Sequence, residues 1–246
     1  MGEGERSIQN LSLPEKALDF FSNKWGIEQL HPPQFEAMKP LFDRSNILLA
    51  IPTASGKSLV AYIGILNQLL NLNPGSRAVY IVPLKALASE KFDDLKQIGE
   101  HLGLKIGLGI GDATAEAKNI DDSDILICTS EKLDSLMRTR SELMSNVSIV
   151  VADEFHLLHD ASRGPTLEIN LTRLRTLRPN AQLIALSATV GNCDILAKWL
   201  DATLIQSDWR PVDLEYATLH DRHLEPRKIQ SSSLDSTVQA LSPPRH

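Results

Sequence analysis

The sequence predicts an α/β protein whose parallel sheet is covered by helices on both faces. From residue 46 onward, short runs rich in β-branched and other apolar residues alternate with longer stretches at helical spacing. Most of the short runs are too continuously apolar for a sheet with one face in water, which indicates strands buried on both sides. The seven predicted strands are Asn46–Ile51, Arg77–Val82, Lys105–Leu108, Asp124–Cys128, Ser148–Ala152, Gln182–Leu186 and Thr203–Ile205.

The stretches between these strands predict amphipathic crossover helices whose leucines face the core. Residues at helical spacing, most of them leucine or isoleucine, recur in two long segments: Leu84, Leu87, Lys91, Leu95, Ile98 and Leu102, and Leu167, Leu171, Leu174 and Arg178. Ahead of the first strand, Pro14 to Trp25 has the same spacing and ends at Gly26, which predicts a short N-terminal helix.

The chain is expected to have three parts. Residues 1–45 form an N-terminal helical segment, and residues 46–218 form one domain around the sheet. Residues 219–246 are polar, with three serines from Ser231 to Ser233, and predict a linker without a strand.

Composition excludes several classes of protein. The 246 residues are 42% hydrophobic, which is enough for a sizeable core, and the apolar runs are far shorter than the roughly 20 residues of a membrane helix. The charged N-terminus predicts no secretory signal, so we expect a cytoplasmic protein without a membrane partner. Cys128 and Cys193 lack metal or redox spacing. A net charge of −6 argues against coating nucleic acid by bulk electrostatics, so any such contact must be local.

A phosphate-binding loop is predicted directly after the first strand. The residues that would form it are Ile51, Pro52, Thr53, Ala54, Ser55, Gly56, Lys57 and Ser58, and an apolar helix follows. Backbone N–H groups of such a loop surround phosphates, while Lys57 would bind the β and γ phosphates and Ser58 would bind Mg²⁺. Ile51 stands where the general pattern has glycine, and the alternative is an ordinary turn.

Two carboxylates follow the buried strand Ser148–Ala152. Asp153 can hold Mg²⁺, and Glu154 can polarise an attacking water. We expect adjacent strands to place this pair beside the phosphate loop, although Asp153 could instead cap the next helix. A third element, Ser187-Ala188-Thr189, follows the strand Gln182–Leu186, where small hydroxyl residues also commonly start a helix.

Taken in order, these elements resemble the first RecA-like domain, a P-loop NTPase fold, of superfamily 2 helicases over nearly the whole chain. The matching elements are Gln34, IPTASGKS (51–58), DEFH (153–156) and SAT (187–189), and the last letter of DEFH, His156, separates the chain from the DEAD-box RNA helicases. Longer stretches look like those of Ski-type helicases, and are most similar to the archaeal HelQ-type DNA helicases that act at stalled replication forks. These stretches are VPLKALASEK (82–91), Gly111-Asp112, TSEKLDSLMR (129–138), DEFHLLHDASRGPTLE (153–168) and SDWRPV (207–212).

The resemblance implies residue roles that composition cannot supply. Gln34 would read the adenine ring of ATP, and His156, Ser187, Ala188 and Thr189 would couple ATP state to strand binding through a second RecA-like domain of the same protein. Contacts to single-stranded or forked DNA would come from loops at the carboxyl ends of strands. The residues implied are Pro83, Leu84, Lys85, Ala86, Gly111, Asp112, Thr129, Ser130, Lys132 and Arg138.

The leading hypothesis is therefore a motor domain that uses ATP and Mg²⁺ in a DNA-dependent ATPase, which moves along one strand and displaces the other. The resemblance implies movement from 3′ to 5′. An RNA helicase of the Ski type is the alternative from the same superfamily, since phosphate contacts do not distinguish the two substrates. A nucleotide-dependent module that does not hydrolyse ATP is the other alternative, against which the intact Lys57, Asp153 and Glu154 argue. The chain by itself is expected to be inactive, because the family's ATP lies between two RecA-like domains.

Overall fold

The computed structural model describes residues 3–111, 117–118, 120–189, 191–212, 216–220 and 223–227. The chain divides into two compact units, residues 1–209 and 210–246, which are described separately below.

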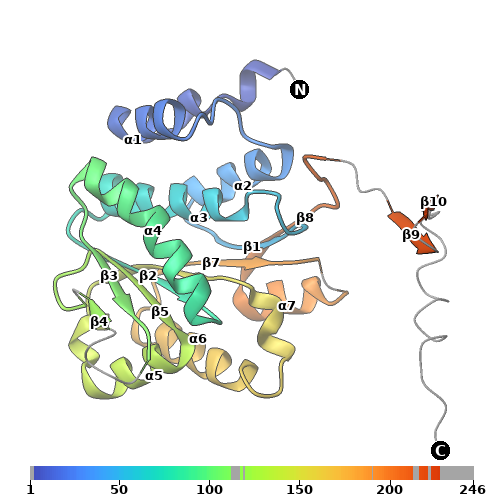
Figure 1. Cartoon of the computed structure of the whole chain (residues 1–246). Coiled ribbons are helices and arrows are strands. Elements are labelled where there is room, and N and C mark those ends of the chain that lie inside the picture. The colour runs from blue at the N-terminus through green and yellow to red at the C-terminus, as the bar shows by residue number, and fades with distance from the viewer. Residues whose placement is uncertain are drawn as a thin grey trace, which may run out of the picture. The chain divides into compact units, whose positions relative to one another are not determined.

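The first unit is built on an eight-stranded sheet in the order β4-β3-β5-β2-β6-β7-β1-β8 (Figure 1). Its strands are β1 (Asn46–Ala50), β2 (Arg77–Val82), β3 (Ile106–Gly109), β4 (Ala117–Lys118), β5 (Ile125–Thr129), β6 (Val147–Ala152), β7 (Gln182–Ser187) and β8 (Ala202–Gln206). Seven strands run parallel, and only the short edge strand β4 is antiparallel to its neighbour. All seven predicted strands are confirmed, whereas β4 was not predicted.

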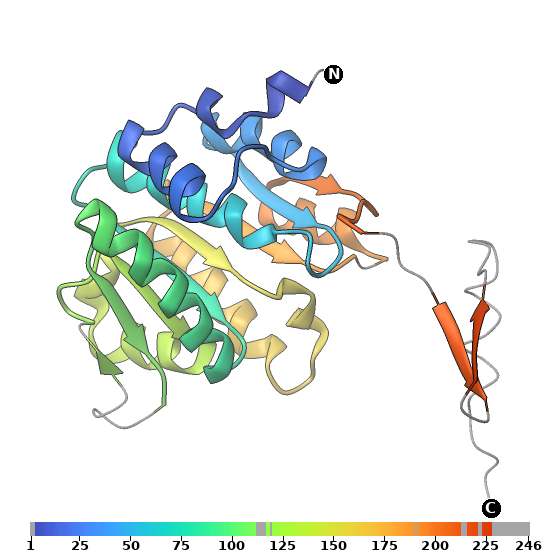
Figure 2. The ribbon, with the colours of Figure 1, turned by 45° about the horizontal axis from the view of Figure 1, so that its top comes forward.

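Helices cover both faces of this sheet, which confirms the predicted α/β class (Figures 1 and 2). One face carries α2 (Pro32–Phe42), α3 (Lys57–Leu66) and α4 (Lys85–Leu102), and the other carries α5 (Ser130–Thr139), α6 (Gly164–Leu177) and α7 (Cys193–Leu200). Successive residues of β1 point into different cores: Ile47 and Leu49 pack with the first layer, and Leu48 and Ala50 with the second.

The N-terminal segment packs outside the first helical layer. The predicted helix is confirmed as α1 (Glu15–Asp19) followed by the π-helical turn η3 (Phe20–Lys24), and the chain turns at Gly26 with φ of +66°. The Trp25 ring lies 5.9 Å from the Tyr62 ring of α3, which anchors the segment to the domain. The remaining short helices are η1 (Glu3–Arg6), η2 (Ile8–Asn10), η4 (Asn67–Leu72), η6 (Ser141–Met144) and η7 (Phe155–His159).

Three predictions about packing and order need correction. Leu84 is 42% exposed instead of buried, because it precedes α4 in extended conformation. Strands β1 and β6 are not adjacent, since β7 pairs with both and lies between them. The third correction concerns the tail.

The second unit contains a two-stranded antiparallel sheet of β9 (Tyr216–His220) and β10 (His223–Arg227). The prediction of no strand from Leu219 onward is wrong. Pro226 lies within β10, and proline in a segment argues against a strand because it has no N–H to donate. An edge strand nevertheless tolerates proline.

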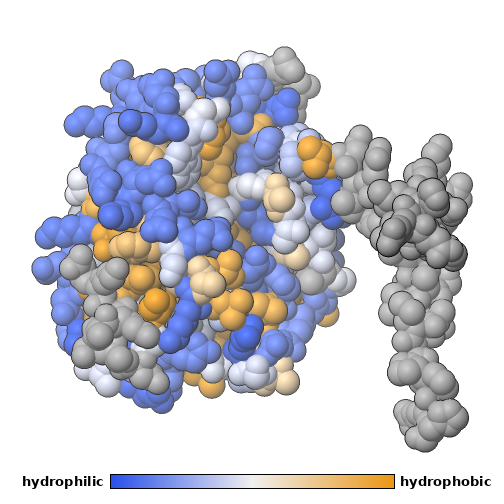
Figure 3. Space-filling view, in the orientation of Figure 1, coloured by the Kyte–Doolittle hydropathy of each residue, from blue (hydrophilic) through white to orange (hydrophobic). Residues whose placement is uncertain are grey.

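The surface of the first unit is mixed. On the face drawn in Figure 3, hydrophobic residues reach the surface in several separate places, and the N-terminal helices at the top are mainly hydrophilic. Within the described ranges, none of the helices is long and apolar enough to cross a membrane.

Candidate nucleotide and nucleic-acid site

The carboxyl ends of the parallel strands gather the predicted residues into two neighbouring groups. The ends of β6, β7 and β1 are consecutive in the sheet and carry the carboxylates, SAT and the phosphate loop; we call this the nucleotide half. The ends of β3, β5 and β2 are also consecutive and carry the predicted strand contacts; we call this the strand-contact half. Sites in open parallel sheets commonly form at this edge.

The phosphate loop joins β1 to α3 and is held by its own backbone. Gly56 has φ of +73°, a backbone conformation that favours glycine, and a Cβ there would lie 2.4 Å from Gln34 Nε2, so that the Gln34 amide would have to move. Lys57 Nζ donates to the Ile51 carbonyl at 3.2 Å. The Ile51 side chain is fully buried and its backbone has no positive φ, which explains why isoleucine is tolerated where the general pattern has glycine.

Gln34 is buried and fixed to this loop. Its Nε2 donates to the Gly56 carbonyl at 2.9 Å and to the Ser55 carbonyl at 3.3 Å, while its Oε1 accepts from His31 N at 2.7 Å. The amide thus links the start of α2 to the phosphate loop. To read adenine it would have to exchange some of these partners, and that role stays a prediction.

Asp153 and Glu154 follow β6 in a constrained turn. Asp153 Oδ2 accepts from the Tyr80 hydroxyl at 2.9 Å, and Oδ1 accepts from Glu154 N at 2.9 Å. Asp153 does not cap η7, whose N-cap residue is Glu154 with a left-handed φ of +48°. Glu154 Oε2 is buried without a hydrogen-bond partner among the described residues. A strained backbone and an unsatisfied buried oxygen are typical of a functional position.

Burial and nearby charges act in opposite directions on the pKa of the loop lysine. Burial lowers the pKa of Lys57, the charges of Glu154 and Asp153 act to raise it, and Lys91 acts to lower it. Burial, and then the charge of Asp153, holds the pKa of Tyr80 well above its usual range, so this phenol stays a neutral donor. The loop lysine therefore lies within electrostatic reach of both carboxylates, although β7 separates their strands.

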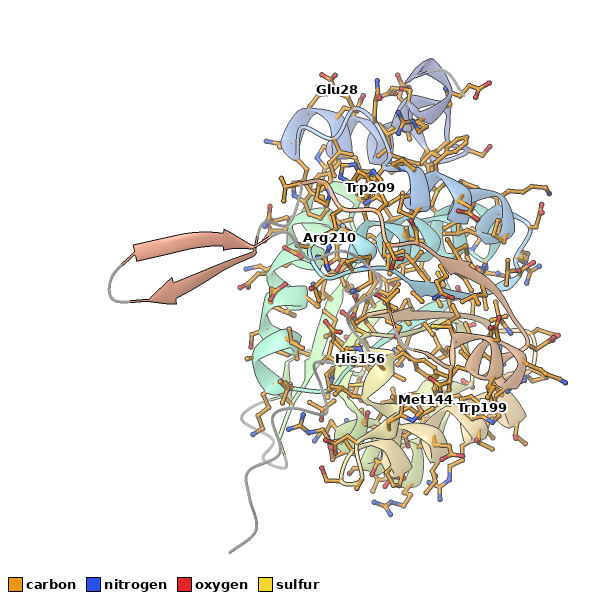
Figure 4. All side chains as sticks on the ribbon, turned by 90° about the vertical axis from the view of Figure 1, so that its right-hand side faces the viewer. Glu28, Met144, His156, Trp199, Trp209 and Arg210 are labelled. Carbon is orange, nitrogen blue, oxygen red and sulfur yellow. The ribbon has the colours of Figure 1, made fainter. Side chains whose placement is uncertain are left out.

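The SAT and DEFH segments contact each other. Ser187 Oγ donates to the Ala188 carbonyl at 2.7 Å, and Ala188 N donates to His156 Nδ1 at 3.4 Å. His156 Nδ1 also lies 3.3 Å from Glu154 Oε2. Because Nδ1 accepts from a backbone N–H, the neutral ring cannot donate to Glu154 from the same atom. Thr189, the last residue of the SAT segment, is half-buried. His156 is labelled in Figure 4.

In the strand-contact half, β2 and β5 present different surfaces. Pro83 is half-buried after β2, and Leu84, Lys85 and Ala86 are exposed at the start of α4. After β5, Thr129 and Ser130 are buried: Thr129 Oγ1 caps α5 by accepting from Lys132 N at 3.3 Å, and the Ser130 carbonyl accepts from Asn170 Nδ2 at 2.7 Å.

The other predicted contacts are less uniform. Gly111 follows β3 with φ of +69°, and Asp112 lies outside the described residues. Lys132 is half-buried with its stem beside Gly109. Arg138 is eight residues beyond Ser130, or about 12 Å further along α5. Its guanidinium binds Asp134 at 2.7 Å, so the structure does not bring Arg138 together with the other residues.

A small pocket lies where the two halves meet. Its lining includes Pro83 and Ser130 from the strand-contact half, Asp153 and Glu154 from the nucleotide half, and Arg163. Sequence reasoning gave Arg163 no role, although it directly precedes α6 beside the carboxylates.

The residues present fit a magnesium ion better than a fully protein-bound metal. Within the described ranges there is no cluster of three or more His, Cys, Asp or Glu. Ser58 and Asp153 carry hard oxygens of the kind that magnesium prefers, and Asp153 Oδ2 also accepts from the Tyr80 hydroxyl. Magnesium characteristically takes one or two protein oxygens, with water and phosphate supplying the rest.

Sequence reasoning missed several residues of the site. Tyr80 lies within a predicted buried strand. Lys91 belongs to a predicted helix and ends the VPLKALASEK stretch, but neither observation gives it a role; a lysine on the core face of a helix is the available signal. Trp209, labelled in Figure 4, packs against His31 with ring centroids 4.5 Å apart and the rings tilted by 37°, and its carbonyl accepts from Ser55 Oγ at 3.5 Å. This aromatic pair lies beside the Gln34 end of the loop.

Comparison with known proteins decides the family. Residues 31–196 match the family model described as DEAD/DEAH box helicase. The chain belongs to this family. Membership agrees with the order of the loop, carboxylate and SAT segments along the chain.

Among curated members, the chain is 45% identical over 226 residues to the ATP-dependent DNA helicase Hel308 of Methanocella arvoryzae, covering 90% of this chain and 30% of that protein. It is 46% identical over 208 residues to Hel308 of Pyrococcus horikoshii, covering 84% and 28%. The Methanocaldococcus jannaschii Hel308 is 46% identical over 216 residues, covering 86% and 18%. The chain thus spans less than a third of these relatives.

The fold is shared with a solved helicase. The crystal structure of the DUF1998 helicase MrfA bound to DNA superposes with a TM-score of 0.70 at 24% sequence identity, covering 80% of this chain and 30% of that one. At that identity the likeness concerns the fold alone.

Proposed function

We propose that this chain is the ATP-binding motor domain of a DNA-dependent ATPase that translocates 3′ to 5′ and unwinds DNA in the repair of stalled replication forks. The observation that carries the proposal is the nucleotide half: the consecutive strands β6, β7 and β1 end in the carboxylates Asp153 and Glu154, the SAT segment and the phosphate loop with Lys57. The relatives are named ATP-dependent DNA helicases, which supports DNA over RNA as the substrate.

Binding of ATP would use groups already in place. The N–H groups at the start of α3 and the Lys57 ammonium would bind phosphates, after Lys57 leaves the Ile51 carbonyl. Gln34 and the nearby rings of His31 and Trp209, which pack against each other, would bind the adenine ring. Ser58 and Asp153 would hold Mg²⁺, whose charge, when it is bound, offsets that of the phosphates.

Hydrolysis would depend on Glu154. Its Oε2 has no hydrogen-bond partner among the described residues, so it is ready to accept a proton from an attacking water. His156 contacts Glu154 on one side and the SAT backbone on the other, which supports a coupling role for His156, Ser187, Ala188 and Thr189. A second RecA-like domain would complete the site by supplying arginines.

The track for single-stranded or forked DNA would run over the strand-contact half. Lys85 and the backbone around Pro83 and Gly111 face the same sheet edge as the buried Thr129 and Ser130. This local track is compatible with the net charge of −6. A motor working on DNA would act in the cytoplasm.

Strand-displacement assays test this function. The chain would be extended through the remaining length of its relatives and supplied with ATP, Mg²⁺ and three substrates of equal sequence: 3′-tailed DNA, 5′-tailed DNA and 3′-tailed RNA. We expect the 3′-tailed DNA to be unwound fastest. Preferential unwinding of the RNA would establish the Ski-type alternative, and ATP binding without turnover on any substrate would establish a nucleotide-dependent binding module.

A further inference from the structure

A lysine on the helix of the strand-contact half reaches the phosphate loop. Lys91 lies in the second turn of α4, and its side chain is 10% exposed. Its Nζ donates to Ser58 Oγ at 3.0 Å and to Glu90 Oε1 at 2.9 Å. Ser58 is the hydroxyl expected to bind Mg²⁺, so Lys91 joins the metal site to the helix that begins with Lys85 and Ala86.

This contact belongs to a buried polar cluster. The Tyr80 hydroxyl donates to Asp153 at 2.9 Å, the Tyr62 hydroxyl donates to Asp94 of α4 at 2.8 Å, and the two rings lie 6.2 Å apart. Burial is the main cause that raises the pKa of both phenols, and the Ser58 hydroxyl acts against it on both. The Ser58 hydroxyl therefore acts on both phenols, and its hydrogen bond with Lys91 ties α4 to the loop.

The contact between Lys91 and Ser58 conflicts with metal binding. A serine hydroxyl has two lone pairs, and in this structure the Lys91 ammonium takes one of them. A magnesium ion about 2 Å from the same oxygen would lie within about 5 Å of the ammonium. Like charges at that separation repel strongly in a partly buried site. The ammonium and the metal therefore compete for one hydroxyl.

We propose that Lys91 is a positioning residue that holds the Ser58 hydroxyl in the nucleotide-free chain and releases it when Mg²⁺ arrives with ATP, so that α4 responds to occupancy of the metal site. The inference rests on the proposed function, because it takes the loop as the site of Mg²⁺ and ATP. Before the metal binds, Lys91 adds positive charge beside the phosphates; afterwards Glu90 remains as its partner.

Two consequences separate this role from a merely structural one. Removing the Lys91 charge should strengthen the binding of Mg²⁺, because the ammonium that competes for Ser58 is gone. The same change should weaken nucleotide binding in the absence of metal, because a positive charge beside the phosphates is lost. By thermodynamic linkage, DNA bound at the start of α4 and nucleotide bound with Mg²⁺ should each alter the affinity of the other through Lys91. A packing role would lower stability without changing the magnesium dependence.

The experiment is a magnesium titration on the 246-residue chain. Binding of a fluorescent ATP analogue is measured from excess EDTA to saturating Mg²⁺ for wild type, Lys91→Met, Lys91→Gln and Lys91→Arg, with Lys96→Met as the control. Lys96 lies on the same helix and is 56% exposed, with a loose contact of 3.7 Å to Glu100.

For Lys91→Met and Lys91→Gln we expect the half-saturating Mg²⁺ concentration to fall about three- to tenfold, and affinity in EDTA to fall by a similar factor. Lys91→Arg and Lys96→Met should behave like wild type. If circular dichroism shows that Lys91→Met is unfolded, Lys91→Gln decides. An unchanged magnesium dependence in the folded variant overturns the inference and leaves the nucleotide site standing, whereas a wild-type chain that binds no analogue overturns both.

A second measurement addresses α4 directly. The affinity for a fluorescent single-stranded oligonucleotide is measured with and without a non-hydrolysable ATP analogue and Mg²⁺. We expect the nucleotide to change DNA affinity in wild type and in Lys96→Met, and to change it less in Lys91→Met and Lys91→Gln. Equal coupling in all four proteins would overturn the link between the metal site and α4.

Discussion

The two halves of the sheet edge are built in opposite ways. In the nucleotide half the charged and polar side chains Lys57, Asp153 and Gln34 are buried, and each is fixed by hydrogen bonds. In the strand-contact half Lys85 and Ala86 are exposed, and the buried Thr129 is used to cap its own helix. Chemistry on phosphates requires donors placed in advance, whereas a track along which a strand slides requires many weak contacts that are readily exchanged.

The sharpest test of this contrast is the loss of one buried cation from the nucleotide half. Lys57→Ala should weaken binding of a fluorescent ATP analogue with Mg²⁺ by at least about 100-fold, since an ammonium makes charge-assisted bonds to phosphates. Lys39→Ala is the control, because Lys39 is exposed and pairs with the exposed Asp43. Equal affinities for wild type and Lys57→Ala would show that the loop is an ordinary turn.

The second prediction separates turnover from binding within the nucleotide half. In a chain extended through a second motor domain, Glu154→Gln should keep ATP affinity and lower steady-state hydrolysis about 10²- to 10⁴-fold, because the amide cannot accept a proton from water. Phosphate release and analogue binding are measured side by side. Turnover within a few-fold of wild type would remove Glu154 as the base.

Replacing Gln34 should have a smaller effect, either on nucleotide discrimination or on the stability of the loop. Gln34→Ala removes three hydrogen bonds that hold the loop and the start of α2. We expect discrimination between ATP and GTP, measured by competition against the fluorescent analogue, to fall about three- to tenfold. If discrimination is unchanged while the thermal midpoint falls, Gln34 supports the loop and does not read the base.

In the strand-contact half, single changes should be mild. Lys85→Glu should weaken binding of single-stranded DNA and lower the slope of log affinity against log salt by about one, the value for a lost phosphate contact. Fluorescence anisotropy over a range of salt concentrations measures both quantities. A charge reversal that leaves affinity and slope unaltered would count against the track.

Arg138 should matter least among the predicted contacts. Its guanidinium is 64% exposed and pairs with Asp134, at the far end of α5 from the strand ends. Arg138→Ala should therefore change DNA affinity by no more than about twofold in the same assay. A loss equal to that of Lys85→Glu would extend the track along α5.

The contrast between the halves also explains what the sequence could reveal. Parallel strands buried on both faces leave continuous apolar runs, so all seven were predictable, and the loop and carboxylates follow such runs directly. The local sequence pattern carries no information about the order of strands in the sheet. It therefore does not predict that β7 lies between β1 and β6. The contacts of Lys91 with Ser58 and of Tyr80 with Asp153 join residues 33 and 73 positions apart, and periodicity carries no information about such pairs.

The central claim is that this chain holds one complete half of a catalytic site and needs a second domain to work. Arg138 and Arg173 pair with Asp134, and Arg178 binds the backbone of residues 145 and 147, so none of these three is placed to neutralise the γ phosphate. Arg163 does line the pocket with Asp153 and Glu154, so the claim requires that Arg163 alone does not replace the arginines of a second domain. An arginine supplied by a partner domain is typically worth roughly 10³ to 10⁵ in rate.

Phosphate release with and without single-stranded DNA, from residues 1–246 and from a chain extended through the second domain, tests this claim most directly. We predict negligible turnover from residues 1–246 under both conditions and DNA-stimulated turnover from the extended chain. Comparable stimulated turnover from residues 1–246 alone would contradict the account.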